Sequence, residues 1–161
     1  MKSVIFLFAA CATAVADEIP KGEPVESRIF TKPYFEKNTS GLTGDASCLI
    51  CADAAAFDKV FGVAFVMGKK PELLAKDDFE KKLVVAVIRR DNALFEYKNV
   101  QATTANGVLY LRYSAEKKGA GGMARFSSPL IVAVNRGDYR SIVFVENGKK
   151  AGTLETSKRE R

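Results

Sequence analysis

The chain has 161 residues, of which 47% are hydrophobic and 27% are charged, and its formal net charge is +6. This length and apolar content fit one domain with a hydrophobic core and exclude a disordered chain. The chain contains no histidine. That absence excludes Ser-His-Asp and Cys-His nucleophile pairs, histidine-ligated zinc and c-type haem.

Residues 1–16 predict a secretory signal peptide. Lys2 supplies the positive charge, Val4 to Ala10 form a short apolar stretch, and Ala14-Val15-Ala16 gives a cleavage pattern of small residues. We therefore expect a secreted or periplasmic protein. The alternative is a bacterial lipoprotein with a lipid anchor at Cys11. No apolar run reaches the roughly 20 residues that cross a membrane, so we expect no transmembrane segment.

The rest of the chain predicts one domain between two charged ends. Residues 17–27 carry two prolines and five charges and predict a flexible leader. A single α+β domain is expected over 28–155, beginning with an edge strand or extended arm around Pro33. The charged tail, 156–161, is expected to be frayed.

A short strand followed by a helix is expected next. Residues 46–52 are mainly apolar and predict a buried strand, and Asp53 is suited to cap a helix over 54–61. One apolar face of that helix would carry Phe57, Val60 and Phe61. Residues 62–70 favour a strand or an irregular segment, and 71–82 favour a single helical turn.

From residue 83 onward the pattern is clearly that of strands joined by turns. Asn106-Gly107 and Asn147-Gly148 are hairpin signals, and 117–122 predicts a flexible loop. These features predict an α+β fold, mostly an antiparallel meander sheet with one short helix packed on it. The expected strands are 83–90, 95–104, 109–113, 129–135, 139–145 and 151–154.

The spacing of Cys48 and Cys51 is the only one in the sequence that is typical of a redox or metal site. The pair precedes the helix that Asp53 would cap, and a helix N-terminus stabilises a thiolate. Thioredoxin-like oxidoreductases use a C-x-x-C at that place, but the βαβ context they require is missing here. A structural disulfide or two buried thiols in an exported protein is the other interpretation. Zinc would need two further ligands, so no metal site is expected.

The other polar clusters indicate no catalytic site. Gly119 to Gly122 lacks the Gly-Lys-Ser/Thr ending of a phosphate-binding loop, and Asp77-Asp78 lies in a charged stretch typical of a solvated turn. Basic doublets are spread along the chain, which does not fit nucleic acid as a partner. They favour lysines that discourage pairing at strand edges, and the alternative is attraction to anionic envelope polymers or acidic proteins. We expect no catalytic residue and no cofactor.

A resemblance to a known family supports a binding function. Asp78-Phe79-Glu80-Lys81 leads into the apolar 83–88, and after a meander Ser128 to Val132 forms a proline-led strand. In this layout residues from about 46 to 146 resemble the secreted domain family named for the protease complex subunit PrcB. The family's Gly-Gly-Tyr-like turn is replaced by Asp91-Asn92-Ala93. The resemblance implies a non-catalytic extracytoplasmic domain that associates with another protein, and it transfers no catalytic residue.

Three hypotheses follow from the sequence. The first is an exported, non-enzymatic domain that binds another extracytoplasmic protein. The second is a thiol-disulfide oxidoreductase that uses Cys48 and Cys51. The third is a binder of a small molecule against a sheet, which no motif selects.

Overall fold

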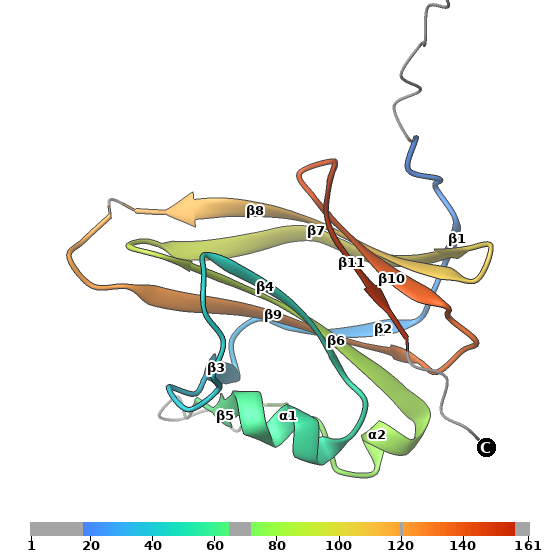
Figure 1. Ribbon diagram of the computed structural model, residues 1–161, viewed down its shortest axis with the longest axis horizontal. Coiled ribbons are helices and arrows are strands. Elements are labelled where there is room, and N and C mark those ends of the chain that lie inside the picture. Colours follow the sequence, from blue (N-terminus) through green and yellow to red (C-terminus); the bar gives the residue numbers. More distant parts are fainter. Residues whose placement is uncertain (1–17, 65–71, 120, 157–161) are drawn as a thin grey trace, which may run out of the picture.

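The computed structural model describes residues 18–64, 72–119 and 121–156 (Figure 1). The described elements are, in chain order, β1 (Glu23–Pro24), β2 (Ser27–Phe30), β3 (Tyr34–Glu36), β4 (Ala46–Cys51), α1 (Ala54–Val60), β5 (Phe61–Val63), α2 (Asp78–Lys81), β6 (Lys82–Asp91), β7 (Leu94–Ala105), β8 (Val108–Lys118), β9 (Phe126–Asn135), β10 (Ser141–Glu146) and β11 (Lys149–Glu155). The predicted signal peptide, Cys11 and most of the segment 62–70 lie outside the described residues.

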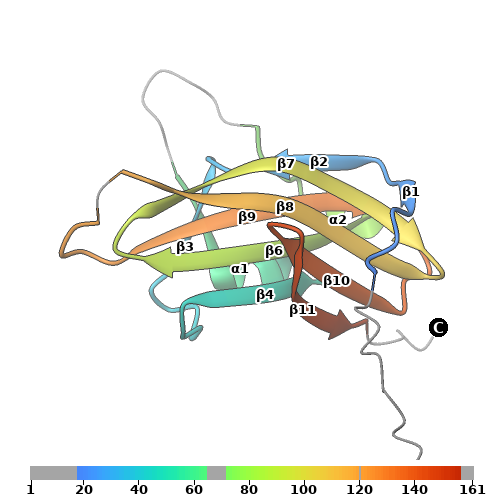
Figure 2. The same cartoon turned by 90° about the horizontal axis from the view of Figure 1, so that it is seen from above.

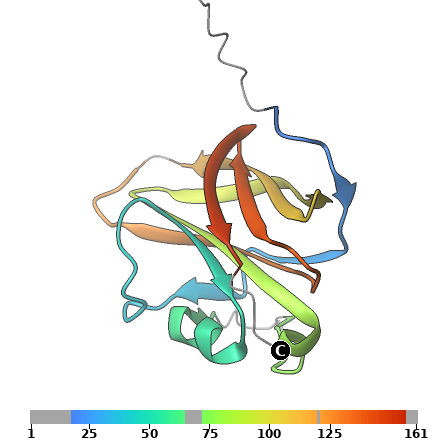
Figure 3. The same cartoon turned by 45° about the vertical axis from the view of Figure 1, so that its right-hand side comes forward.

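Two sheets pack face to face, and a helical layer covers the second of them (Figures 1 and 2). The five-stranded sheet, called here the outer sheet, has the order β1-β7-β8-β10-β11, and the four-stranded central sheet has the order β2-β9-β6-β4. The strand pair β3-β5 lies with α1 and α2 against the free face of the central sheet (Figure 3). Pairing is antiparallel except between β8 and β10, which run parallel.

The central sheet is buried on both faces, which explains the long apolar runs of its two inner strands. Val85 and Val87 of β6 pack into the core between the two sheets. Val84, Ala86 and Ile88 alternate with them and pack into a second core beneath the helices. In β9 the same alternation applies, so neither strand shows the polar face of a half-exposed strand.

The predicted α+β class is wrong. Strands hold 56% of the described residues and helices 8%, so the fold is nearly all-β, with three sheets and two short helices in the described ranges. The apolar face of Phe57 and Val60 does form, but the helix has only seven residues and ends where Phe61 enters β5. The helix is short because the segments on either side of it form strands, β4 paired with β6 and β5 paired with β3.

Part of the segment that was predicted to be a flexible leader forms a strand of the outer sheet. Glu23 and Pro24 form β1 and pair with Thr104 and Thr103 of β7. The Val25 N–H then donates to the Ala102 carbonyl at 2.9 Å. This part of the segment is therefore held against the sheet by backbone hydrogen bonds.

Both predicted Asn-Gly hairpins are confirmed. Asn106 and Gly107 have φ of +52° and +72°, and Asn147 and Gly148 have φ of +50° and +78°. Two consecutive positive φ angles are the requirement of a type I′ turn, which asparagine and glycine tolerate best. The turns join β7 to β8 and β10 to β11.

Candidate functional site

The two cysteines of the C-x-x-C motif lie on opposite faces of β4. Cys48 pairs in register with Val87 and packs against the core between the sheets, whereas Cys51 pairs with Val84 and belongs to the core beneath the helices. Three residues of extended chain span about 10 Å, and side chains alternate between faces. This is too far for a disulfide, and both thiols are free.

Burial makes both thiols hard to ionise. Burial, with the charge of Glu146 nearby, raises the pKa of Cys48 to about 11. Burial and the carboxylate of Asp53 raise the pKa of Cys51 to about 12. Asp53 does cap α1, since its Oδ1 accepts from the Ala56 N–H at 2.8 Å. Cys51, however, ends a strand outside that helix, and the cap adds a negative charge beside its thiol. The geometry fits two structural thiols.

A group of polar side chains lies between the sheets near Cys48. Arg89 of β6 forms an ion pair with Glu146 of β10 at 3.3 Å, and its guanidinium lies 4.9 Å from the ring centroid of Phe95. Tyr97 and Tyr113 pack edge to face at 5.8 Å. These residues join β6 of the central sheet to three strands of the outer sheet.

Two atoms of this group are buried without a hydrogen-bond partner in the described ranges. They are Arg89 Nε and the Tyr113 hydroxyl. Burial, followed by the charge of Glu146, raises the pKa of Tyr113. This group could not be predicted from the sequence, because it forms only when β6 packs against the strands of the other sheet, including the distant β10.

One end of the sandwich exposes three large apolar side chains, called here the apolar tip: Leu94, Met123 and Phe126. Leu94 follows the β6–β7 turn and pairs with Lys118, whereas Phe126 pairs with Asp91 before that turn. The Gly122 N–H donates to the Asn92 carbonyl at 2.9 Å, so the loop that carries Met123 is joined to the same turn. Leu94 is 50% exposed and Phe126 is 42% exposed.

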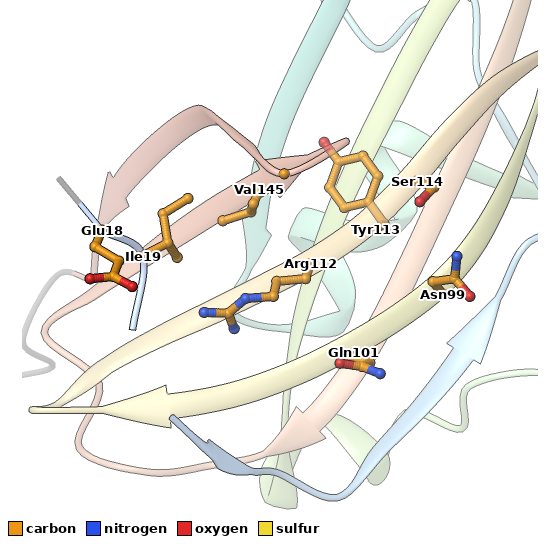
Figure 4. A pocket seen from close by; sticks show the side chains of 9 residues that line it. Glu18, Ile19, Asn99, Gln101, Arg112, Tyr113, Ser114 and Val145 are labelled. Atoms are coloured by element: carbon orange, nitrogen blue, oxygen red, sulfur yellow. The ribbon is translucent and has the colours of Figure 1, made fainter. Parts of the chain in front are cut away.

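A hollow of about 540 Å³ lies on the outer sheet beside the N-terminal segment (Figure 4). Arg112 and Ser114 of β8, with Asn99 and Gln101 of β7, supply polar side chains to it, and Glu18 lines it from the N-terminal segment. Sequence analysis did not identify this hollow. The only local signal was an asparagine, a poor strand former, in the middle of the predicted strand 95–104.

The charged clusters seen in the sequence mainly form ion pairs within the fold. Asp78 accepts from Arg28 at 3.3 Å and from the Ala75 N–H at 2.9 Å. Among the basic doublets, Arg90 pairs with Glu36 at 2.6 Å and Lys117 with Asp91 at 2.7 Å. No group of three or more cysteine and carboxylate side chains suited to a metal ion is present in the part of the chain that the structure describes.

Among the described residues, no helix has both the length and the apolar character to cross a membrane. Comparison with known proteins gives no significant match to a family model, to a curated protein or to a solved structure.

Proposed function

We propose that the chain is an exported, non-catalytic domain that binds another extracytoplasmic protein through its apolar tip. The observation that carries this proposal is the exposure of Leu94, Met123 and Phe126 at one end of the sandwich. Contiguous apolar surface rimmed by polar groups marks an interaction site, and we propose that these three side chains form such a surface. Export is supported by the sequence pattern of residues 1–16.

The framework around the apolar tip is suited to present it without rearrangement. Arg125, between Met123 and Phe126 in the chain, donates to Asp45 Oδ1 at 2.6 Å and to the Gly44 carbonyl at 3.0 Å. These bonds attach the loop of Met123 to the central sheet. A preorganised apolar surface loses little conformational entropy on binding, which favours affinity.

Charge indicates the kind of partner. The chain carries a net charge of +6. Lys118 lies opposite Leu94 at the apolar tip and forms no ion pair in the described ranges, whereas the nearby Lys117 and Arg125 are paired with Asp91 and Asp45. Positive surfaces attract acidic partners and raise association rates. The partner is therefore a protein with an apolar patch bordered by carboxylates. The resemblance of residues 46–146 to the PrcB-named domain implies the same class of function.

Photo-crosslinking followed by affinity measurement tests the proposal. A photoreactive amino acid at Met123, in the chain expressed in its own organism, should capture one dominant extracytoplasmic protein. That protein, once purified, should bind the unmodified chain. Leu94→Ser and Phe126→Ser should each weaken binding about tenfold or more, as expected of apolar residues central to an interface.

Ile29→Ser is the matched control, since Ile29 is 45% exposed and lies on β2, where it pairs with Val132 in the middle of β9. It should leave the affinity unchanged. The proposal is wrong if no protein is captured, or if Ile29→Ser weakens binding as much as the tip variants.

A further inference from the structure

The hollow on the outer sheet has the composition of a ligand site separate from the apolar tip. Its walls come from the N-terminal segment, β7, β8, β10 and the β10–β11 turn (Figure 4). Ile19 and Val145 give it an apolar side, and charged and amide side chains give it a polar side. Small-molecule sites combine apolar walls with a few placed polar groups in this way.

Arg112 is held in place but its charge is not neutralised by an ion pair in the described ranges. One terminal nitrogen donates to Thr103 Oγ1 and the other to the Pro20 carbonyl, and the guanidinium lies 5.1 Å from the ring centroid of Tyr110. All three partners are uncharged. A guanidinium has five N–H groups, so three are left after these two bonds. A fixed cation with free donors is suited to a carboxylate.

Glu18 brings the opposite charge to the same hollow. Its side chain and that of Arg112 both line the space (Figure 4), yet they form no ion pair with each other. Two charges of opposite sign that form no ion pair within the described ranges complement a ligand that carries both charges. A simple anion would meet repulsion from Glu18, and a simple cation would meet repulsion from Arg112.

Asn99 supports the assignment of a ligand site, because its backbone has a positive φ although it does not lie in a turn. The described chain has three non-glycine residues with positive φ, and all are asparagines. Asn106 and Asn147 form the hairpin turns, but Asn99, with φ of +53°, lies inside β7 where the register shifts between Lys98 and Gln101. Such bulges redirect side chains and are frequent beside binding sites. Here the bulge places the Asn99 side chain at the hollow.

We propose that this hollow binds a small zwitterion of the amino acid or dipeptide class. The ligand's carboxylate would accept hydrogen bonds from Arg112, and its ammonium group would donate to the Glu18 carboxylate. Asn99, Gln101 and Ser114 can bond the ligand's peptide group, since amides and hydroxyls both donate and accept. The apolar side of the hollow accommodates aliphatic side chains. This site does not depend on the binding function proposed for the apolar tip.

The test is a titration of the exported, purified chain with three related probes. L-Ala-L-Ala carries both charges, its N-acetyl form carries only the carboxylate, and its C-terminal amide carries only the ammonium group. The zwitterion should bind most tightly by calorimetry and by nitrogen–proton correlation spectra. The amide signals that move should be those of residues around the hollow, such as Gln101, Ser114 and Val145.

Variants separate the roles of the two charges. Arg112→Gln should weaken zwitterion binding about 10- to 100-fold, the value of a lost charge-assisted hydrogen bond. Glu18→Gln changes an exposed side chain, and it should remove the preference for the free amine. Arg140→Gln is the matched control, because Arg140 also bonds a backbone carbonyl, that of Asn106, but does not line the hollow.

Three results would overturn the proposal. The first is that L-Ala-L-Ala does not bind at millimolar concentration. The second is that the N-acetyl probe binds as well as the zwitterion. The third is that Glu18→Gln leaves the discrimination among the probes unchanged.

Discussion

Cys48 and Cys51 are three residues apart in one strand and therefore face different cores. Cys48 points between the two sheets and Cys51 points beneath the helices. A pair of thiols that exchanges electrons must approach within bonding distance. Separation by the thickness of the central sheet prevents this, whatever the compartment.

Alkaline titration checks the state of these thiols. Both are expected to stay protonated at neutral pH, because burial raises their pKa values to about 11 for Cys48 and about 12 for Cys51. In the unfolded chain a thiol ionises near its usual pKa of about 8.5. The folded state therefore holds its protons longer, and the free energy of unfolding falls as pH rises from about 8.5 towards 12.

Thiolate absorbance and urea unfolding at pH 7 and pH 10 measure this effect. The Cys51→Val variant should lose less stability between the two pH values than the unchanged chain, because it lacks one of the groups that titrate on unfolding. A folded-state thiol pKa at or below about 8.5 would contradict the assignment and restore the oxidoreductase hypothesis.

Removal of one partner from the buried ion pair of Glu36 and Arg90 should strongly destabilise the fold. Arg90 donates to both carboxylate oxygens, from Nε at 2.8 Å and from a terminal nitrogen at 2.6 Å, and both side chains are more than nine-tenths buried. Glu36→Gln leaves the guanidinium without its anion and should cost about 3–5 kcal/mol. Glu116→Gln breaks the exposed pair with Lys98 and should leave the stability nearly unchanged.

The same pair predicts a loss of stability in acid. Burial alone would raise the pKa of Glu36, but hydrogen bonds from Arg90, Ser127 and Ser40 outweigh it and hold the pKa below its usual value. Stability from this group is therefore present above the unfolded pKa of about 4.3 and is lost as pH falls through the lower folded value. Unfolding in urea between pH 6 and pH 3 measures it, and Glu36→Gln should flatten the curve.

Local structure that depends on adjacent residues in the chain could be predicted from the sequence. The Asp53 cap, the two Asn-Gly turns and the apolar strand from residue 83 all depend on local backbone preferences. The alternation of side chains in the predicted strand 46–52 also places its two cysteines on opposite faces.

The sheet assignment and the sites depend on distant pairing, which no local pattern specifies. Only the turn at residues 92–93 separates β6 from β7, yet the two strands belong to different sheets. β8 and β10 pair directly and in parallel, although β9 lies between them in the chain. Glu18 and Val145 both line the hollow, because the N-terminal segment lies over the outer sheet. The fold class was wrong for the same reason, because several short strands gain their stability from partners far along the chain.

Asn147 is expected to matter more than the equivalent Asn106. Both take the positive φ of a turn, but Asn147 also extends the ladder beside β8: its side chain accepts from the Ala115 N–H at 3.1 Å and donates to the Ala115 carbonyl at 3.2 Å. Asn106→Ala should cost about 1–2 kcal/mol through backbone strain alone. Asn147→Ala should cost about 1 kcal/mol more for each lost hydrogen bond. Equal losses in urea unfolding would show that the side-chain bonds contribute nothing.

Tyr97 and Tyr113 should respond in opposite ways to removal of the hydroxyl. The Tyr97 hydroxyl donates to the Ser128 carbonyl at 2.6 Å and so joins the two sheets, whereas that of Tyr113 is buried without a partner in the described ranges. Tyr97→Phe should cost about 1 kcal/mol, the net value of a buried hydrogen bond. Tyr113→Phe should be neutral or stabilising, because an unpaired buried hydroxyl carries a desolvation cost that phenylalanine lacks.

Urea unfolding of the two variants at pH 7 measures this difference, and alkaline pH provides a second readout. Burial, with the charge of Glu146, raises the pKa of Tyr113, so the unfolded chain ionises this phenol first and stability falls above pH 10. Tyr113→Phe removes that contribution and should therefore be less sensitive between pH 10 and pH 11. A loss at pH 7 as large as that of Tyr97→Phe would contradict the prediction. It would mean that the Tyr113 hydroxyl is hydrogen-bonded in solution, for which the Glu146 carboxylate is the nearest candidate.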